Sequence, residues 1–219
     1  MKIKLNTFIL IDKPKGWTSF DVVAKIRRLA SQQSGVKKIR VGHAGTLDPF
    51  ATGLLIVGVG REATKRLDGF KAQKKVYVAE LTLGQVSDTY DSAGVISDVN
   101  LEEKPNKSQI KEALYGFLGQ QKQIPPMFSA KKINGKRLYE LARQGKEVER
   151  KPSDIEIYNI KLKRYKYPRL VIKVECSTGT YVRSLVNDIG QKLGVGAYCQ
   201  ELRRTRIGKH GVWRAGKIG

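Results

Sequence analysis

The residues from 41 to 59 constrain the fold more than any other part of this sequence. An apolar run from Leu54 to Val59 follows a loop that contains Gly42, Gly45 and Gly53. A short apolar run bounded by turn residues is typical of a strand buried in a sheet. We therefore predict a buried strand over residues 53–59, preceded by a tight loop.

The loop carries one carboxylate, Asp48, and Pro49 follows it directly. Proline fixes its own φ and biases the residue before it toward extended geometry, whereas glycine permits turns and close backbone approach. Such a loop is suited to presenting a single acid to a ligand. Asp-Pro is also a common turn dipeptide, so this stretch alone leaves an ordinary turn equally open.

The charge of the chain points to a polyanionic partner. With 219 residues, 40% of them hydrophobic, the chain is long enough to bury a core. It has 42 Lys and Arg residues against 20 acids, a net charge of +22 and a pI near 10. Nucleic acid is favoured over an anionic membrane surface, because no apolar run approaches the roughly 20 residues of a spanning helix.

Metal, redox and cofactor chemistry lack support in the sequence. The cysteines Cys176 and Cys199 are far apart, and the only histidines are His43 and His210. We therefore expect two buried thiols, with neither a disulfide nor a metal site. Glycine fingerprints of nucleotide sites and the HExxH motif are missing, so no cofactor is expected. The apolar stretch Phe8–Ile11 is too short for a signal peptide, which predicts a cytoplasmic protein.

Hydrophobic periodicity predicts both helices and strands along the chain. In the segment KVYVAELTL, alternation places Tyr77 on the apolar side with Leu81 and Leu83. A loop is expected over 85–94. The predicted strands cover residues 7–12, 53–59, 75–83, 153–165, 170–176, 198–207 and 211–213, and the predicted helices cover 18–30, 64–70, 108–118, 136–144 and the part of 177–190 after its glycine turn.

Residues 121–151 form a basic segment. It contains nine Lys or Arg residues against three acids, a net charge of +6. This composition predicts a projection that contacts phosphates. A solvated helical hairpin with no binding role would have the same composition.

Three aromatic or cationic side chains form, with Asp48, a set that could hold a flipped base. An aromatic ring such as Tyr77 or Tyr181 can stack on the base, and Arg183 can orient the acid. The carboxylate can then attack or deprotonate a sugar carbon. Plainer alternatives are a core aromatic for Tyr77, a phosphate contact for Arg183 and a loop hydrogen bond for His43.

The segments that carry these residues resemble one family along almost the whole chain, in collinear order. They are similar to the bacterial TruB family, the tRNA pseudouridine synthases that modify the uridine at position 55 in the T-loop. The combination of the aspartate motif with the tyrosine-arginine motif is specific to that family. The matching segments are LIDKPKGWTS (10–19), GHAGTLDPFATGLL (42–55), KVYVAELTLG (75–84), RLYELARQG (137–145), CSTGTYVRSLVNDIG (176–190) and LRRTRIG (202–208).

The resemblance implies a catalytic role for three residues. Asp48 would be the nucleophile in a reaction that detaches uracil from C1′ of ribose, rotates it and rejoins it through C5, without cofactor or metal. Whether Asp48 attacks C1′ or assists a glycal route stays open. Tyr77 would stack on the base and is a candidate base for the C5 proton. Arg183 would pair with Asp48 and keep it ionised.

The substrate contacts follow from the same resemblance. Tyr181 would contact the target nucleotide, and His43 and Leu202 would line the bound T-loop. The glycines around Asp48 would let the RNA backbone come close to the acid. The segment 121–151 would clamp the T-arm, with Lys131, Lys132, Lys136, Arg137 and Arg143 as candidates for backbone binding.

The implied fold is α+β, a pseudouridine synthase fold with a bent, mainly antiparallel sheet flanked by helices and loops. Residues 1–219 would form one catalytic domain that lacks the C-terminal PUA-type module of many relatives. The expected partner is the T-arm of tRNA, bound by a monomer that needs no other protein and no membrane. Two other functions stay open: a non-catalytic RNA-binding or folding protein, and a guide-RNA-dependent synthase acting on ribosomal RNA.

Overall fold

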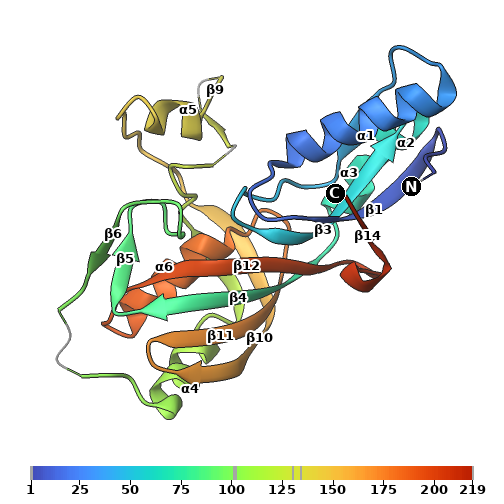
Figure 1. Cartoon of the computed structure of the whole chain (residues 1–219). Coiled ribbons are helices and arrows are strands. Elements are labelled where there is room, and N and C mark those ends of the chain that lie inside the picture. The colour runs from blue at the N-terminus through green and yellow to red at the C-terminus, as the bar shows by residue number, and fades with distance from the viewer. Residues whose placement is uncertain (1, 101–102, 130, 134, 219) are drawn as a thin grey trace. The chain divides into compact units, whose positions relative to one another are not determined.

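The computed structural model describes residues 2–100, 103–129, 131–133 and 135–218. The chain folds into two compact units. Unit 1 comprises residues 1–78 and 202–219, and unit 2 comprises residues 79–201. Strands β4 (Lys75–Leu83) and β12 (Ala197–Ile207) each contribute residues to both units (Figure 1).

In unit 1 the strands follow the order β14-β1-β3-β12, with β2 added to β3 and β13 added to β12. Strand β3 is antiparallel to β1 and β2 and parallel to β12. Strand β14 is parallel to β1. Besides the ends of β4 and β12, the elements are β1 (Thr7–Lys13), α1 (Ser19–Ser34), β2 (Val41–His43), β3 (Thr52–Val59), α2 (Arg61–Lys65), α3 (Leu67–Lys71), β13 (His210–Gly211), the 3-10 helix η1 (Val212–Arg214) and β14 (Gly216–Lys217).

Strand β3 is buried on both faces, as the apolar run predicts. Leu55 and Val57 pack into one core together with residues of α1. Leu54 and Ile56 pack into a second core that includes Leu67 of α3. A strand covered on both sides has no solvent-facing positions, which explains why its sequence is apolar rather than alternating. The prediction of a buried strand at 53–59 is confirmed.

Helix α1 begins at Ser19, one residue after the predicted start, because Thr18 and Asp21 form a capping box. The Thr18 hydroxyl accepts a hydrogen bond from the Asp21 backbone at 3.0 Å, and the Asp21 carboxylate accepts one from the Thr18 backbone at 2.8 Å. The helix continues past the predicted end to Ser34. It stops where Gly35 adopts the left-handed conformation, with φ of 71°.

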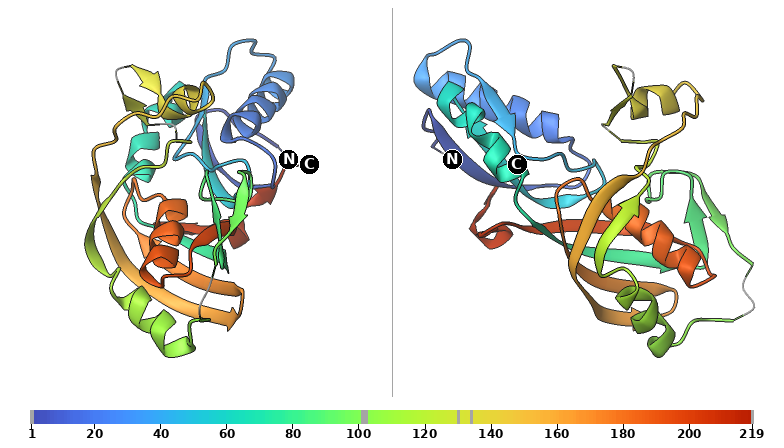
Figure 2. Two further views of the ribbon diagram at one scale, coloured as in Figure 1. Left: turned by 90° about the vertical axis from the view of Figure 1, so that its left-hand side faces the viewer. Right: turned by 180° about the vertical axis from the view of Figure 1, so that it is seen from behind.

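In unit 2 the strands follow the order β12-β4-β11-β10-β7. Helices α4 and α6 lie on the same face of these strands (Figure 2). Strands β10 and β11 form the predicted antiparallel hairpin. The elements are the ends of β4 and β12, β5 (Gln85–Ser87), β6 (Ile96–Asp98), α4 (Lys107–Tyr115), β7 (Gly119–Gln123), β8 (Lys132–Ile133), β9 (Lys136–Arg137), α5 (Leu138–Ala142), β10 (Ser153–Lys166), β11 (Arg169–Cys176) and α6 (Val182–Lys192).

Four sequence predictions need correction. The loop predicted over 85–94 begins with β5, which pairs with β6 in a polar hairpin that apolar alternation does not reveal. The helix predicted over 64–70 is the pair α2 and α3. The helix predicted over 136–144 is only α5, which follows the short β8–β9 hairpin. The strand predicted over 211–213 ends at Gly211, where the turn of η1 replaces it.

The α+β class and the mainly antiparallel sheet are confirmed. Both cysteines are buried, as predicted. None of the helices in the described part of the chain is long and apolar enough to cross a membrane.

Gly53 is required where β3 approaches β12. It has a φ of 106°, and a Cβ atom there would lie 2.3 Å from the backbone oxygen of Arg204. We expect Gly53→Ala to lower the free energy of unfolding by roughly 2–4 kcal/mol, because left-handed strain and a backbone clash add. Urea unfolding measures this change. The matched control is Gly69→Ala in α3, where a Cβ meets no atom within 4 Å; a cost as large as that of Gly53→Ala would contradict the explanation.

Candidate active site

Asp48 lies in the loop 44–51 between β2 and β3, and this loop is held by its backbone. The Ser19 hydroxyl, at the start of α1, accepts a hydrogen bond from the Leu47 backbone at 2.8 Å and donates to the Leu47 carbonyl at 3.1 Å. The Gly16 backbone donates to the Pro49 carbonyl at 2.8 Å. The residues on either side of Asp48 are therefore fixed by contacts that do not involve its carboxylate.

Arg204 holds the same loop from β12. Its side chain is buried, with 1% of the residue exposed. The guanidinium donates from Nη2 to the Gly45 carbonyl at 3.0 Å and from Nη1 to the Thr46 carbonyl at 3.4 Å. Its Nε donates to the Leu54 carbonyl at 2.8 Å. One buried cation thus joins the start of the loop that carries Asp48 to strand β3, which follows the loop.

Lys13 is the second buried cation of unit 1. The residue is fully buried at the end of β1, and its ammonium donates to the carbonyls of Trp17 at 2.6 Å and Pro14 at 3.0 Å. A third, longer contact at 3.4 Å reaches the carbonyl of Pro49, next to Asp48. The ammonium therefore joins the turn after β1 to the Asp48 loop.

The pKa of Lys13 is set mainly by burial and, to a smaller extent, by the charges around its ammonium. Burial lowers this pKa from 10.5 to about 8, because a charged amine loses its hydration. The negative charge of Asp48 opposes the shift and raises the pKa of Lys13, whereas the positive charge of Arg204 lowers it. Asp48 is thus placed in a neighbourhood with two cations whose donors are directed at backbone carbonyls.

The loop glycines have different uses from the one we expected. A Cβ at Gly53 would strike the Arg204 backbone, and one at Gly42 would lie 3.1 Å from the Leu67 side chain. For these two positions close packing within unit 1, and not the approach of RNA, explains the glycine. Gly45 has a φ of 94° and only Arg204 near its would-be Cβ, at 3.6 Å, so its turn conformation is the constraint.

The remaining predicted residues of unit 1 lie on its strands. Tyr77 in β4 is buried, with 8% exposed, on the apolar side that alternation predicts. Leu202 in β12 is also buried. His43 ends β2, and burial lowers its pKa, with further lowering by Arg204 and Lys71. Its imidazole is therefore neutral at pH 7.

Tyr181 and Arg183 lie at the start of α6 in unit 2, as predicted. Tyr181 is the N-cap residue, and its backbone is held on both sides by the buried side chain of Gln123. The Tyr181 N–H donates to Gln123 Oε1 at 2.8 Å, and Gln123 Nε2 donates to the Tyr181 carbonyl at 3.0 Å. This amide pairing fixes the helix start and with it the origin of both side chains.

Arg183 is buried and bonded within unit 2, which differs from a surface phosphate contact. Its Nη1 lies 3.2 Å from a carboxylate oxygen of Asp91 and donates to the Thr89 carbonyl at 2.9 Å. Its Nη2 donates to the Phe128 carbonyl at 2.9 Å. The prediction that Arg183 pairs with Asp48 joins residues of the two units and stays a prediction.

The basic segment 121–151 presents some, but not all, of its cations to solvent. Lys136 and Arg143 are exposed, and the Arg143 guanidinium lies 5.5 Å from the centre of the Tyr139 ring. Lys131 instead donates to the Ser153 hydroxyl at 2.7 Å. The side chains of Lys132 and Arg137 lie outside the described part of the structure.

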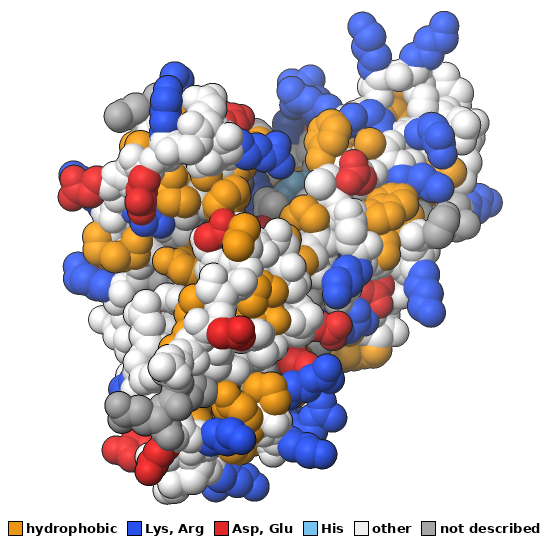
Figure 3. Space-filling view, turned by 60° about the vertical axis from the view of Figure 1, so that its left-hand side comes forward, with side chains coloured by type: hydrophobic (Ala, Val, Ile, Leu, Met, Phe, Trp, Pro, Cys, Tyr) orange, Lys and Arg blue, Asp and Glu red, His pale blue; other side chains and the backbone are white. Residues whose placement is uncertain are grey.

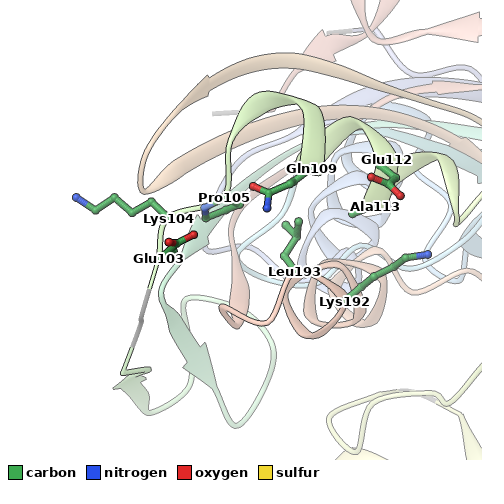
Figure 4. A pocket seen from close by; sticks show the side chains of 8 residues that line it. All are labelled: Glu103, Lys104, Pro105, Gln109, Glu112, Ala113, Lys192 and Leu193. Atoms are coloured by element: carbon green, nitrogen blue, oxygen red, sulfur yellow. The ribbon is translucent and has the colours of Figure 1, made fainter.

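A separate hollow of about 340 Å³ lies in unit 2 between α4 and the end of α6 (Figure 4). Glu103 and Glu112 line it together with Lys104 and Lys192. Because its charges are balanced, it lacks the positive field that a phosphate chain requires.

Sequence reasoning missed Lys13, Arg204, Ser19 and Gln123. A signal exists for the two cations, since each is in phase with buried strand positions. Lys13 follows Ile11 at a spacing of two in β1, and Arg204 follows Leu202 at the same spacing in β12. A cation on the inward side of a strand predicts a buried donor, but no comparable pattern identifies Ser19 or Gln123.

Two family models match the chain. The first, described as TruB family pseudouridylate synthase (N terminal domain), matches residues 28–182. The chain belongs to the TruB family. A second model, described as tRNA pseudouridylate synthase B C-terminal domain, matches residues 183–214. The family resemblance is thereby confirmed.

Curated members of the TruB family are similar along most of this chain. The tRNA pseudouridine synthase B of Protochlamydia amoebophila is 52% identical over 205 residues, which are 93% of this chain and 75% of that protein. That of Parabacteroides distasonis is 49% identical, over 92% of this chain and 85% of that protein. A solved chain from a Cbf5-Nop10-Gar1 complex is 27% identical with a TM-score of 0.71, covering 96% of this chain and 52% of that one.

Lys13 gives a pH dependence that can be measured. Its pKa is lower in the folded state, so between about pH 8 and 10.5 the unfolded chain binds more protons and stability rises with pH. We expect the free energy of unfolding of the wild type, minus that of Lys13→Met, to increase by about 1–2 kcal/mol from pH 7.5 to 9.5. Urea unfolding at both pH values measures this difference.

The direct control is an NMR titration of the Lys13 amine in the wild-type protein. A midpoint near 8 is expected for this amine, and a midpoint at the ordinary lysine value of 10.5 would contradict the assignment. This measurement also covers the case in which Lys13→Met does not fold.

Proposed function

We propose that this protein isomerises uridine 55 in the T-loop of tRNA to pseudouridine, with Asp48 as the catalytic carboxylate. Membership of the TruB family carries the proposal, supported by the placement of Asp48 in a loop anchored through backbone contacts. The curated relatives at 46–52% identity are named tRNA pseudouridine synthase B. We further propose that the protein acts in the cytoplasm as a monomer.

The proposed reaction rearranges bonds within one nucleotide. The N1–C1′ glycosidic bond breaks, a C5–C1′ bond forms, the proton on C5 is lost, and N1 gains a proton. Atoms and charge balance without a cofactor. On either route Asp48 must begin as a carboxylate, because it attacks C1′ directly or takes the C2′ proton to give a glycal.

The surroundings of Asp48 suit such a role. The Lys13 ammonium interacts electrostatically with the opposite charge of Asp48, and the donors of Lys13 and Arg204 are engaged by backbone carbonyls. Because the loop is anchored at Leu47 and Pro49, the carboxylate needs little reorganisation when charge changes in the transition state. Tyr77 is the proposed stacking partner of the base and candidate acceptor of the C5 proton.

The charge of the chain supports an RNA substrate. Lys and Arg side chains are spread widely over the face drawn in Figure 3. Within the basic segment, the exposed Lys136 and Arg143 are the described side chains best placed to bind T-arm phosphates. Such contacts could offset the few kcal/mol that base flipping costs.

The two alternative functions are less well supported. A purely RNA-binding protein gives no reason to anchor an acid that repels phosphate. A guide-RNA-dependent synthase is suggested only by the solved complexes, at 27% identity, whereas the tRNA synthase relatives are nearly twice as identical. Turnover of a bare T-arm stem-loop without other macromolecules separates this protein from a guide-dependent enzyme.

Asp48→Asn tests the catalytic assignment. We expect the variant to release tritium from tRNA labelled at uracil C5 about a thousandfold more slowly or worse, since an amide is neither nucleophile nor base. Its dissociation constant for tRNA should stay within about threefold of the wild type, because no phosphate contact is removed.

The matched control is Asp68→Asn, which alters an exposed acid of the same unit that pairs with Lys71 at 2.8 Å. This control should leave the rate unchanged. Tritium release by Asp48→Asn at the wild-type rate would reject Asp48 as the catalytic group, and loss of tRNA binding would point to a binding role.

The clamp is tested through the salt dependence of tRNA binding. Replacing Lys136 and Arg143 together by Ala should lower the slope of log K against log salt by about 1.5, since each phosphate contact contributes about 0.7–0.9. The control replaces Lys161 and Lys163 of β10, which are exposed in the same unit. Equal losses of slope in the two double variants would show non-specific charge and not a clamp.

A further inference from the structure

We propose that unit 1 carries a second RNA-binding surface, away from Asp48, that holds an unpaired strand of the substrate tRNA outside its T-arm. This surface, the β1 groove, is a hollow of about 440 Å³ along β1. The exposed Trp213 directly precedes Arg214, one of the lining residues, in the chain. The proposal rests on the proposed function, because it assigns the groove to the same substrate.

The groove exists because β1 is only partly covered on one side. Strand β14 pairs with β1 at Ile11 and Asp12, and the described strands add no partner to residues 7–10 along that edge. The hollow is lined by these residues together with Lys2, Lys4, Arg214 and Gly216. A short β14 therefore leaves part of the β1 edge uncovered beside this hollow.

The charges along the groove suit a phosphate backbone. Lys2, Lys4 and Arg214 line it and are exposed. No acid occurs among the described lining residues. This differs from the hollow beside α4, where two glutamates offset two lysines. Three cations on one narrow channel provide the field that a polynucleotide strand requires.

Two aromatic rings of unit 1, each with an arginine guanidinium nearby, suit unpaired bases. Trp213 is 68% exposed, although its ring is held in place against Gly211, where a Cβ would lie 2.1 Å from the ring. The Arg206 guanidinium lies 5.4 Å from the centre of that ring. A large apolar ring held at the surface next to cations is a platform for base stacking, which contributes about 1–3 kcal/mol per base.

Phe8 lines the hollow, and the Arg66 guanidinium lies 5.5 Å from the centre of its ring. The ring is held by the core of unit 1, where it packs edge-on against Phe70 with 4.7 Å between the ring centres. Trp213 and Phe8 thus each have an arginine guanidinium near the ring. This alternation of rings and cations favours a single strand over a duplex, whose bases are already stacked.

The position of the groove separates it from the proposed catalytic loop. Lys13, at the far end of β1, contacts the Asp48 loop. Residues 7–10 lie three to six positions earlier on the same strand, which at about 3.3 Å per residue is roughly 10–20 Å away. A strand in the groove is therefore distinct from the nucleotide that reacts.

An extended peptide is the competing occupant, because an open strand edge can accept an added strand. The lining favours RNA: a strand edge that serves only for peptide pairing requires neither three cations nor an exposed tryptophan. The two occupants are separated by testing RNA directly.

The test compares full-length tRNA with an isolated T-arm stem-loop as substrates. Trp213→Ala and the double variant Lys4→Glu/Arg214→Glu should each raise KM for full-length tRNA about tenfold with kcat unchanged. For the stem-loop, both KM and kcat should stay within about twofold of the wild type. In the wild type, Trp fluorescence should be quenched by full-length tRNA, and Trp213→Phe should retain most of the affinity.

The control double variant Lys37→Glu/Lys38→Glu makes the same charge change at exposed positions of unit 1 outside the groove. An equal effect of this control, an unchanged KM for full-length tRNA, or equal losses with both substrates would overturn the proposal. If the wild type converts neither RNA, the proposed function has failed; filter binding of full-length tRNA to the same variants then still decides whether the groove binds RNA.

Discussion

The structure of unit 1 depends on two buried cations that are satisfied by backbone carbonyls. An isolated buried charge is costly, so Lys13 and Arg204 require fixed acceptors. They find them at the turn after β1 and at both ends of the Asp48 loop. The loop conformation and the burial of the two cations therefore stabilise each other. Both depend on strands β1 and β12, which supply Lys13 and Arg204.

This mutual dependence explains why removal of one partner affects more than one contact. Without Arg204, the buried carbonyl of Leu54 would lose this donor, which costs about 1–3 kcal/mol, and the half-buried carbonyl of Gly45 would lose one too. The parallel pairing of β12 with β3 places the Arg204 guanidinium within reach of these carbonyls. The pairing itself requires the close backbone approach at Gly53. Sheet register and loop geometry are thus a single constraint.

Sequence patterns predict the elements that follow side-chain period and miss those that depend on polar partners. Alternation predicts strand β4 with its observed bounds and with Tyr77 inward, because alternation reports burial directly. It does not predict strand β5, since the pairing of β5 with β6 is polar and includes a Gln85–Asp98 side-chain bond. The 3-10 turn that replaces a predicted strand depends on a single backbone bond from Ala215 to Val212.

The same distinction applies to the candidate site. Sequence motifs single out Asp48, Tyr181 and Arg183 as candidate site residues, because each lies in a short motif of neighbouring residues. They do not identify the Asp91 partner of Arg183, which lies far away in sequence and is brought near only by the fold of unit 2. The sequence does not reveal the role of the buried Gln123 amide either. Its partner is the backbone of Tyr181, and a backbone group gives no signal in the sequence.

The coupling between Lys13 and Asp48 has a consequence for the proposed chemistry. The charge of Asp48, with a smaller contribution from Asp21, opposes the loss of hydration that lowers the pKa of Lys13. On the route in which Asp48 attacks C1′, the C1′–N1 bond breaks and the negative charge passes to the detached uracil. The carboxylate becomes a neutral ester, so the charge of Lys13 loses the support of Asp48. The buried ammonium then costs more free energy than in the resting protein, which favours return of the free carboxylate. Because the donors of Lys13 are already engaged by carbonyls, its ammonium stays in place when Asp48 loses its charge. Lys13 would therefore promote breakdown of the ester intermediate without moving.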